Sequence, residues 1–156
     1  MSESRPIKVS FSFYPTDMTA LADRVAGLKK AGVMVRSATV LRALIHLTPP
    51  GEMIAHAVRL AGKNALGATA PDADNVSGHP TVDLPKEDVK KLDGVVLHLA
   101  RAKIIATRAY VVRAILRAAP DGKLLASAVA QFLADFPNKP RGLSKIRLAR
   151  LAKAHG

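Results

Sequence analysis

The sequence predicts a mainly α-helical protein with one two-stranded antiparallel ribbon, built from two similar halves of a single chain. Three observations lead to this fold class: an internal repeat, helical spacing of apolar residues in both halves, and a short alternating segment ahead of each helical run. With 156 residues and 49% hydrophobic side chains, the chain can bury a core of ordinary size.

The repeat appears when the sequence is slid against itself by 71 positions. Residues 28–58 then align with residues 99–129 without a gap, and 11 of the 31 aligned positions are identical. The identical pairs include Ala38 with Ala109, Val40 with Val111, Arg42 with Arg113, Pro49 with Pro120, and Gly51 with Gly122. Because the shared proline and glycine are strong turn residues, both halves are expected to turn at the same place.

Apolar residues recur with helical spacing at equivalent places in the two halves. The first helical face comprises Met18, Leu21, Val25 and Leu28, matched by Val89, Leu92, Val96 and Leu99. The second comprises Val40, Leu41, Leu44 and Ile45, matched by Val111, Val112, Ile115 and Leu116. The third comprises Met53, Ile54 and Val58, matched by Leu124, Leu125 and Val129. Each half is therefore expected to hold three apolar-faced helices.

A segment that alternates polar and apolar residues precedes the first helix of each half, at 8–13 and 81–84. This alternation is typical of a strand with one buried face. Since a lone strand leaves its backbone groups unpaired, we expect the two segments to pair antiparallel. The residues expected to be buried are Val9, Phe11, Phe13, Val82 and Leu84, and those expected to face outward are Lys8, Ser10, Ser12, Thr81 and Asp83.

The turn between the first and second helices carries different residues in the two halves. Gly32 is expected to end the first helix, and Ser37 to cap the second. In the other half, Lys103 and Thr107 lie near the corresponding places. Because the glycine is missing there, the second turn is expected to have a different geometry.

The predicted organisation has four parts. Residues 7–61 form the first repeat with its third helix, 62–80 a linker without apolar periodicity, 81–137 the second repeat with its third helix, and 138–156 a basic C-terminal tail.

The chain is strongly basic, with 24 Lys and Arg against 12 Asp and Glu and a net charge of +12, which favours a polyanionic partner. Half of this excess lies in the tail, whose basic residues are Lys139, Arg141, Lys145, Arg147, Arg150 and Lys153. They alternate with leucines and an isoleucine, a pattern that favours a basic amphipathic helix. Such a tail could grip DNA nonspecifically, dock on a partner protein or lie on an anionic membrane surface.

Several classes of protein are not expected. The chain has no cysteine, and its five histidines lack the spacing of a metal site. Neither a nucleophile elbow, a phosphate-binding glycine loop nor a catalytic carboxylate pair is found, so we expect no enzyme activity and no cofactor. The longest uncharged stretch, 124–134, is too short to cross a membrane, and the N-terminus lacks a signal-peptide core. A cytoplasmic location is expected.

In the first half, the predicted strand and helix are followed by a glycine turn with the sequence GVMVRSATVLRAL. This half resembles the ribbon-helix-helix family of DNA-binding proteins. The resemblance implies two fused ribbon-helix-helix units that form an intramolecular pseudo-dimer, a monomer with the geometry of a dimer. The first repeat matches the family pattern well, whereas the second is degenerate. Over residues 7 to about 137, the doubling is similar to that of the overdrive-binding accessory proteins of Agrobacterium virC operons, which assist T-DNA transfer.

The resemblance implies that double-stranded DNA is the partner and that the paired strands enter its major groove. The outward strand residues Lys8, Ser10, Ser12, Thr81 and Asp83 would contact base edges. The second-helix N-termini, with Arg36, Ser37, Thr107 and Arg108, would contact phosphates. For Arg42 and Arg113, pairing with a nearby carboxylate is favoured over DNA contact. Because the two strands differ, the DNA site is expected to be imperfectly symmetric.

Three functional classes remain open at this point. The first is an accessory factor for conjugative plasmid or T-DNA transfer, with a relaxase or other DNA-transfer proteins as further partners. The second is a transcriptional repressor. The third is a scaffold whose basic tail binds an acidic protein instead of DNA.

Overall fold

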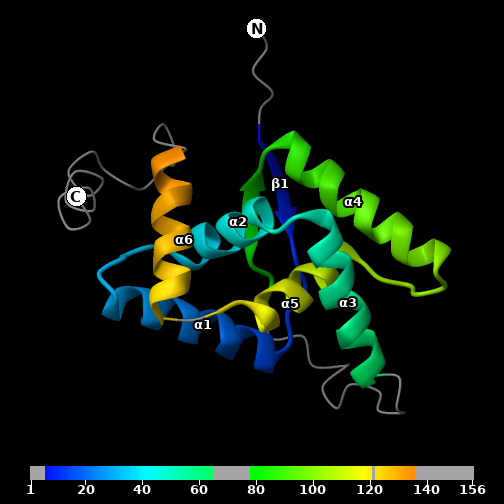
Figure 1. Ribbon diagram of the computed structural model, residues 1–156, viewed down its shortest axis with the longest axis horizontal. Helices are drawn as coiled ribbons and strands as arrows, with labels where there is room; N and C mark the ends of the chain where they lie inside the picture. The colour runs from blue at the N-terminus through cyan, green and yellow to red at the C-terminus, as the bar shows by residue number, and fades with distance from the viewer. Residues whose placement is uncertain (1–5, 65–77, 121, 136–156) are drawn as a thin grey trace, which may run out of the picture.

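The computed structural model describes residues 6–64, 78–120 and 122–135 of the chain. Within these ranges the fold is mainly helical, with one two-stranded antiparallel sheet, as predicted. The elements are β1 (Ile7–Ser10), α1 (Pro15–Lys30), α2 (Ser37–Leu47), α3 (Pro50–Asn64), β2 (Thr81–Leu84), α4 (Lys86–Arg101), α5 (Arg108–Ala118) and α6 (Gly122–Asp135). Figure 1 shows the strands in the middle of the molecule, with α1 and α6 at one end and α3 and α4 at the other.

The bounds of the first two helices of the first half recur in the second half at the offset of the sequence repeat. Helices α1 and α4 have 16 residues each, and α2 and α5 have 11 each. Their first residues move by that same offset, from Pro15 to Lys86 and from Ser37 to Arg108. The shared apolar spacing therefore corresponds to shared helix boundaries.

Strands β1 and β2 form the ribbon, in which Val9 faces Val82 and Ser10 faces Thr81. The backbone hydrogen bond from Phe11 N to Pro80 O, at 3.0 Å, continues the same register beyond the strand ends. The ribbon is therefore longer than the two assigned strands alone.

Phe13 and Gly78 close the extended end of the ribbon. Each backbone nitrogen donates to the carbonyl of the other residue, at 2.9 Å and 3.2 Å. A Cβ atom on Gly78 would lie 2.8 Å from Sδ of Met18, closer than a carbon atom can normally approach. A side chain at position 78 would therefore require the Met18 side chain to move where the ribbon passes α1.

The inner face of the ribbon contributes to one continuous core, as its alternation predicted. The side chains of Val9, Phe11, Phe13, Val82 and Leu84 are all buried. In the third helices, the predicted faces are wrong at two positions, because Val58 is 45% exposed and Leu124 is 72% exposed. There the buried faces are set by packing against distant helices, through Met53, Ala57 and Leu60 in α3 and Leu125, Val129, Phe132 and Leu133 in α6.

The third helices cross between the halves. Helix α3 packs against α4 and α5, whereas α6 packs against α1 and α2. Each half is therefore covered by a helix that belongs to the other half in sequence.

The turns after α1 and α4 have the same geometry, so the expected difference between them is wrong. Gly32 has a φ of 91°, and its counterpart Lys103 has a φ of 66°. In both turns a backbone nitrogen, of Val33 or of Ile104, donates at 2.8 Å to a carbonyl in the last turn of the helix, that of Leu28 or Leu99. This shared hydrogen bond holds Lys103 in the left-handed region despite its side chain.

The predicted cap of α2 is also wrong. Arg36 is the N-cap residue and makes no side-chain cap bond, and Ser37 is the first helical residue. In α5, Thr107 is the N-cap, and its Oγ1 accepts from Tyr110 N at 3.1 Å.

Candidate nucleic-acid interface

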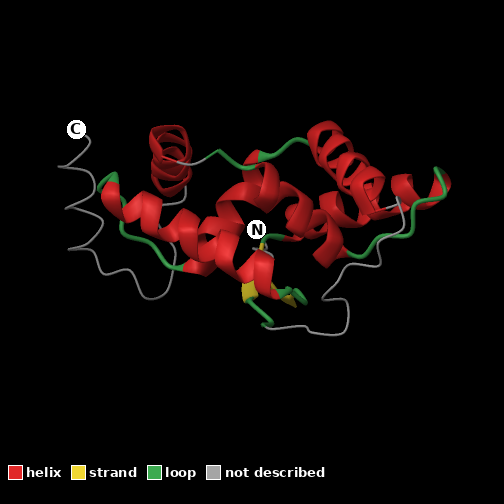
Figure 2. Ribbon diagram, turned by 90° about the horizontal axis from the view of Figure 1, so that it is seen from below, coloured by secondary structure: helices red, strands yellow, loops and turns green. Residues whose placement is uncertain are grey.

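The outer face of the ribbon is polar and open to solvent. Lys8, Ser10, Ser12, Thr81 and Asp83 are all exposed, as the alternation predicted. At the centre, Ser10 Oγ and Thr81 Oγ1 lie 2.8 Å apart. Figure 2 shows the strands on one side of the helical layer, so this face is unobstructed by helices.

His79 adds a further residue to the outer face, which the sequence reasoning missed. It is exposed and follows Gly78 in the extended ribbon, in the register that places it opposite Ser12. Its carbonyl accepts a hydrogen bond from Thr81 Oγ1 at 3.3 Å. The repeat carried the signal, because His79 is the counterpart of Lys8 in the second half and continues the alternation of Thr81 and Asp83.

The two halves of the outer face differ in charge. Lys8 and Asp83 are direct partners across the ribbon. Burial lowers the pKa of the Arg42 guanidinium, and the negative charges of Asp83 and Asp88 oppose that shift. Asp83 therefore lies near a cation, and its acidic side chain is the least favourable one on this face for a polyanion.

The N-terminus of α5 is accompanied by a solvent-exposed ion pair with two hydrogen bonds. Arg108 donates from Nε to Asp93 Oδ1 at 2.6 Å and from Nη2 to Asp93 Oδ2 at 2.9 Å. This two-pronged contact lowers the pKa of the Asp93 carboxyl and raises that of Arg108. Arg108 is therefore held beside the helix end by a carboxylate that would compete with a phosphate. At the N-terminus of α2, Arg36 and Ser37 are both exposed.

An open hollow of about 650 Å³ joins the ribbon to the N-terminus of α5. It is lined by Ser10, Ser12, Tyr14, Ile105, Thr107, Arg108, Ala109, Tyr110 and Arg113. The outer face of β1 and the start of α5 thus form one concave surface, although they come from different halves of the chain. The hydroxyl and guanidinium groups in the lining can donate hydrogen bonds to an anion.

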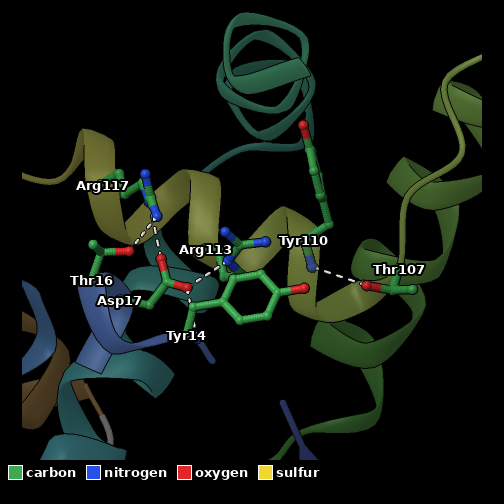
Figure 3. Close-up of polar contacts among 7 residues, drawn as sticks. All are labelled: Tyr14, Thr16, Asp17, Thr107, Tyr110, Arg113 and Arg117. Carbon is green, nitrogen blue, oxygen red and sulfur yellow. Dashed lines mark hydrogen bonds and ion pairs between the residues drawn. The ribbon is translucent and has the colours of Figure 1, made fainter. Parts of the chain in front are cut away.

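A buried carboxylate holds two of the residues that line this hollow, Tyr14 and Arg113 (Figure 3). Asp17 is fully buried and accepts from Arg113 Nε at 2.6 Å and from Arg117 Nε at 2.9 Å. It also accepts from the backbone nitrogen of Tyr14 at 3.0 Å, and the Arg113 guanidinium lies 4.4 Å from the Tyr14 ring centroid. Arg113 is therefore a structural residue paired with a carboxylate, as favoured from the sequence.

The equivalent carboxylate in the second half has a different partner. Asp88, which the repeat equates with Asp17, lies 3.1 Å from Nδ1 of His46. Arg42, the counterpart of Arg113, lies with its guanidinium 5.7 Å from the Phe132 ring centroid. The two sides of the ribbon are thus supported by similar helices but by different polar contacts.

The basic tail residues, Lys139, Arg141, Lys145, Arg147, Arg150 and Lys153, lie outside the described residues. Across the described ranges, no cluster of three or more His, Asp or Glu side chains is arranged to hold a metal ion. None of the helices described is both long and apolar enough to span a bilayer.

The chain shows no significant match to any protein-family model, curated protein or solved structure compared with it.

Proposed function

We propose that this protein is a sequence-selective binder of double-stranded DNA in which two ribbon-helix-helix units form an intramolecular pseudo-dimer. The observation that carries the proposal is the outer face of the ribbon, a row of exposed polar and charged residues centred on Ser10 and Thr81. A two-stranded ribbon fits a major groove about 12 Å wide, where outward side chains meet base edges. The recurrence of the bounds of α1 and α2 in α4 and α5, at the offset of the sequence repeat, supports the pseudo-dimer.

Phosphate contacts would flank the ribbon. The N-termini of α2 and α5 present first-turn amides and a positive dipole end, to which Arg36, Ser37, Thr107 and Arg108 add side-chain donors. These contacts would position the protein and make binding sensitive to salt, whereas the ribbon would supply sequence preference. The basic tail would add further nonspecific affinity.

The DNA site is expected to be imperfectly symmetric. Positions that correspond in the two halves carry Lys8 and His79, Ser10 and Thr81, or Ser12 and Asp83. Only the central pair is chemically similar. A protein of this kind would therefore bind its site in one orientation, which suits an accessory factor that directs plasmid or T-DNA transfer from an origin.

The experiment is a selection of random duplex DNA by the full-length protein at about 150 mM salt. An enriched, imperfectly symmetric motif is expected, and no enrichment would overturn sequence-selective binding. Replacing Lys8 and Ser10 by alanine should then reduce preference for the motif more than affinity for unrelated DNA. A motif at a transfer origin would support the accessory role, whereas one over the protein's own promoter would indicate repression.

A further inference from the structure

Two exposed apolar side chains occupy equivalent places in the two halves. Met34, between α1 and α2, is 50% exposed, and Ile105, between α4 and α5, is 87% exposed. The repeat equates them, and each stands just ahead of the N-cap of the second helix of its half. Single exposed apolar residues are common on protein surfaces. Their recurrence beside both helix N-termini requires an explanation.

The turns themselves hold these side chains outward. The backbone nitrogens of Val33 and Ile104 donate to Leu28 O and Leu99 O at 2.8 Å, and the Val33 side chain is fully buried. Because Val33 points into the core, the next residue, Met34, is directed to solvent. The exposure therefore follows from a hydrogen-bonded turn that is the same in both halves.

Ile105 also lies beside the groups expected to meet DNA. It lines the same hollow as Ser10 and Ser12 of the ribbon and Thr107 and Arg108 of the α5 N-terminus. An apolar group thus stands between the base-contacting strand and the phosphate-contacting helix end. The part of a DNA strand that lies between bases and phosphates is the deoxyribose.

We infer that Met34 and Ile105 pack against deoxyribose rings on the two flanks of the bound DNA site. This inference rests on the proposed duplex binding. Deoxyribose offers C–H groups that an apolar side chain can cover, and such burial releases no counterions. The protein's net charge of +12 favours a polyanion over a second copy of the same chain at this surface.

The test compares the full-length protein with its Met34→Ser, Ile105→Ser double variant on the selected duplex over a range of salt concentrations. Affinity is expected to fall about tenfold, because two apolar contacts are lost. The slope of log affinity against log salt and the selected motif should stay unchanged, since neither phosphate nor base contacts are removed. Leucine at both positions should restore affinity.

Leu124→Ser is the matched control, because Leu124 is 72% exposed and belongs to α6, which lies on the far side of the helical layer from the ribbon (Figures 1 and 2). It should leave DNA affinity unchanged. Wild-type affinity in the double variant would overturn the inference, as would a changed salt slope or motif. A variant that binds a single site normally but fails to bind a second copy on a two-site duplex would also overturn it, because these side chains would then contact protein and not DNA. A wild-type protein that binds no duplex would instead overturn the proposed function.

Discussion

The hydroxyl groups of Ser10 and Thr81 lie 2.8 Å apart across the ribbon, and the same two residues are equated by the sequence repeat. Strand pairing is symmetric about them, with Val9 facing Val82 and Lys8 facing Asp83 on one side. The centre of the ladder and the centre of the repeat therefore coincide. In the proposed complex, this pair marks the middle of the DNA site.

Replacing both hydroxyl residues, Ser10→Ala with Thr81→Ala, should remove sequence preference at the central base pairs. Affinity for unrelated duplexes should change less than about threefold, because phosphate contacts supply it. Sequencing of DNA selected by the variant checks this. Ser127→Ala, at an exposed serine of α6, is the control. An unchanged central motif would show that these hydroxyls do not contact bases.

Asp17→Asn should lower the free energy of unfolding by about 3–5 kcal/mol, because Arg113 would be left buried without its carboxylate. Urea unfolding followed by circular dichroism measures the loss. Asp23→Asn removes an exposed carboxylate from the same helix and should change stability by less than about 0.5 kcal/mol. A similarly small effect at Asp17 would contradict the structural role given to this residue.

Asp93→Asn should increase affinity for duplex DNA several-fold, because it frees Arg108 from a competing carboxylate. The salt dependence should steepen by about one unit if Arg108 then neutralises a phosphate. Binding titrations at several salt concentrations check both, with Asp23→Asn as the control for charge alone. No gain beyond that control would exclude Arg108 from the phosphate contacts.

The stabilisation that the Arg108–Asp93 ion pair gives to the fold depends on pH. Arg108 holds the pKa of Asp93 below its ordinary value of 3.8 in the folded protein, so the pair stabilises the fold at higher pH. That contribution is lost as pH falls through the lowered pKa. Below about pH 4, the free energy of unfolding should therefore fall less steeply with decreasing pH in Asp93→Asn than in the wild type. The same pH dependence of unfolding in both proteins would contradict this effect of the ion pair.

Lys103→Gly should stabilise the protein by about 0.5–1 kcal/mol, because Lys103 has a φ of 66° that glycine adopts without strain. Thermal unfolding would register this as a rise in Tm. The same substitution at Lys90, an exposed residue within α4, should instead destabilise by about 1 kcal/mol. A fall in Tm for Lys103→Gly would show that the lysine side chain stabilises this turn.

The local pattern of the sequence predicted the helices, the strand segments and the outward residues of the ribbon. Each depends on a period that neighbouring residues share. The buried Val9 and Phe11 could therefore be distinguished from the exposed Ser10 without tertiary information. The extension of the ribbon to His79 was missed because Gly78 and Pro80 disrupt the strand pattern. Backbone bonds to Phe13 and Phe11 nonetheless continue the pairing.

Contacts between distant residues could not be predicted in this way. Arg113 and Asp17 lie in different halves of the chain, and no local spacing indicates that they meet. The conformation of Lys103 was missed for a related reason, because a hydrogen bond from Ile104 N to Leu99 O overrides the preference of the lysine. The same limit applies to Val58 and Leu124, whose exposure depends on which distant helix their own helix packs against.

The exchange of α3 and α6 makes the two halves mutually dependent for folding. An isolated first half would lose α6 from α1 and α2, and would leave α3 without the α4 and α5 surface on which it packs. Neither half could then bury its apolar faces alone. The cooperative unit of folding is therefore the span from β1 to α6, and heating should melt both halves in one calorimetric transition.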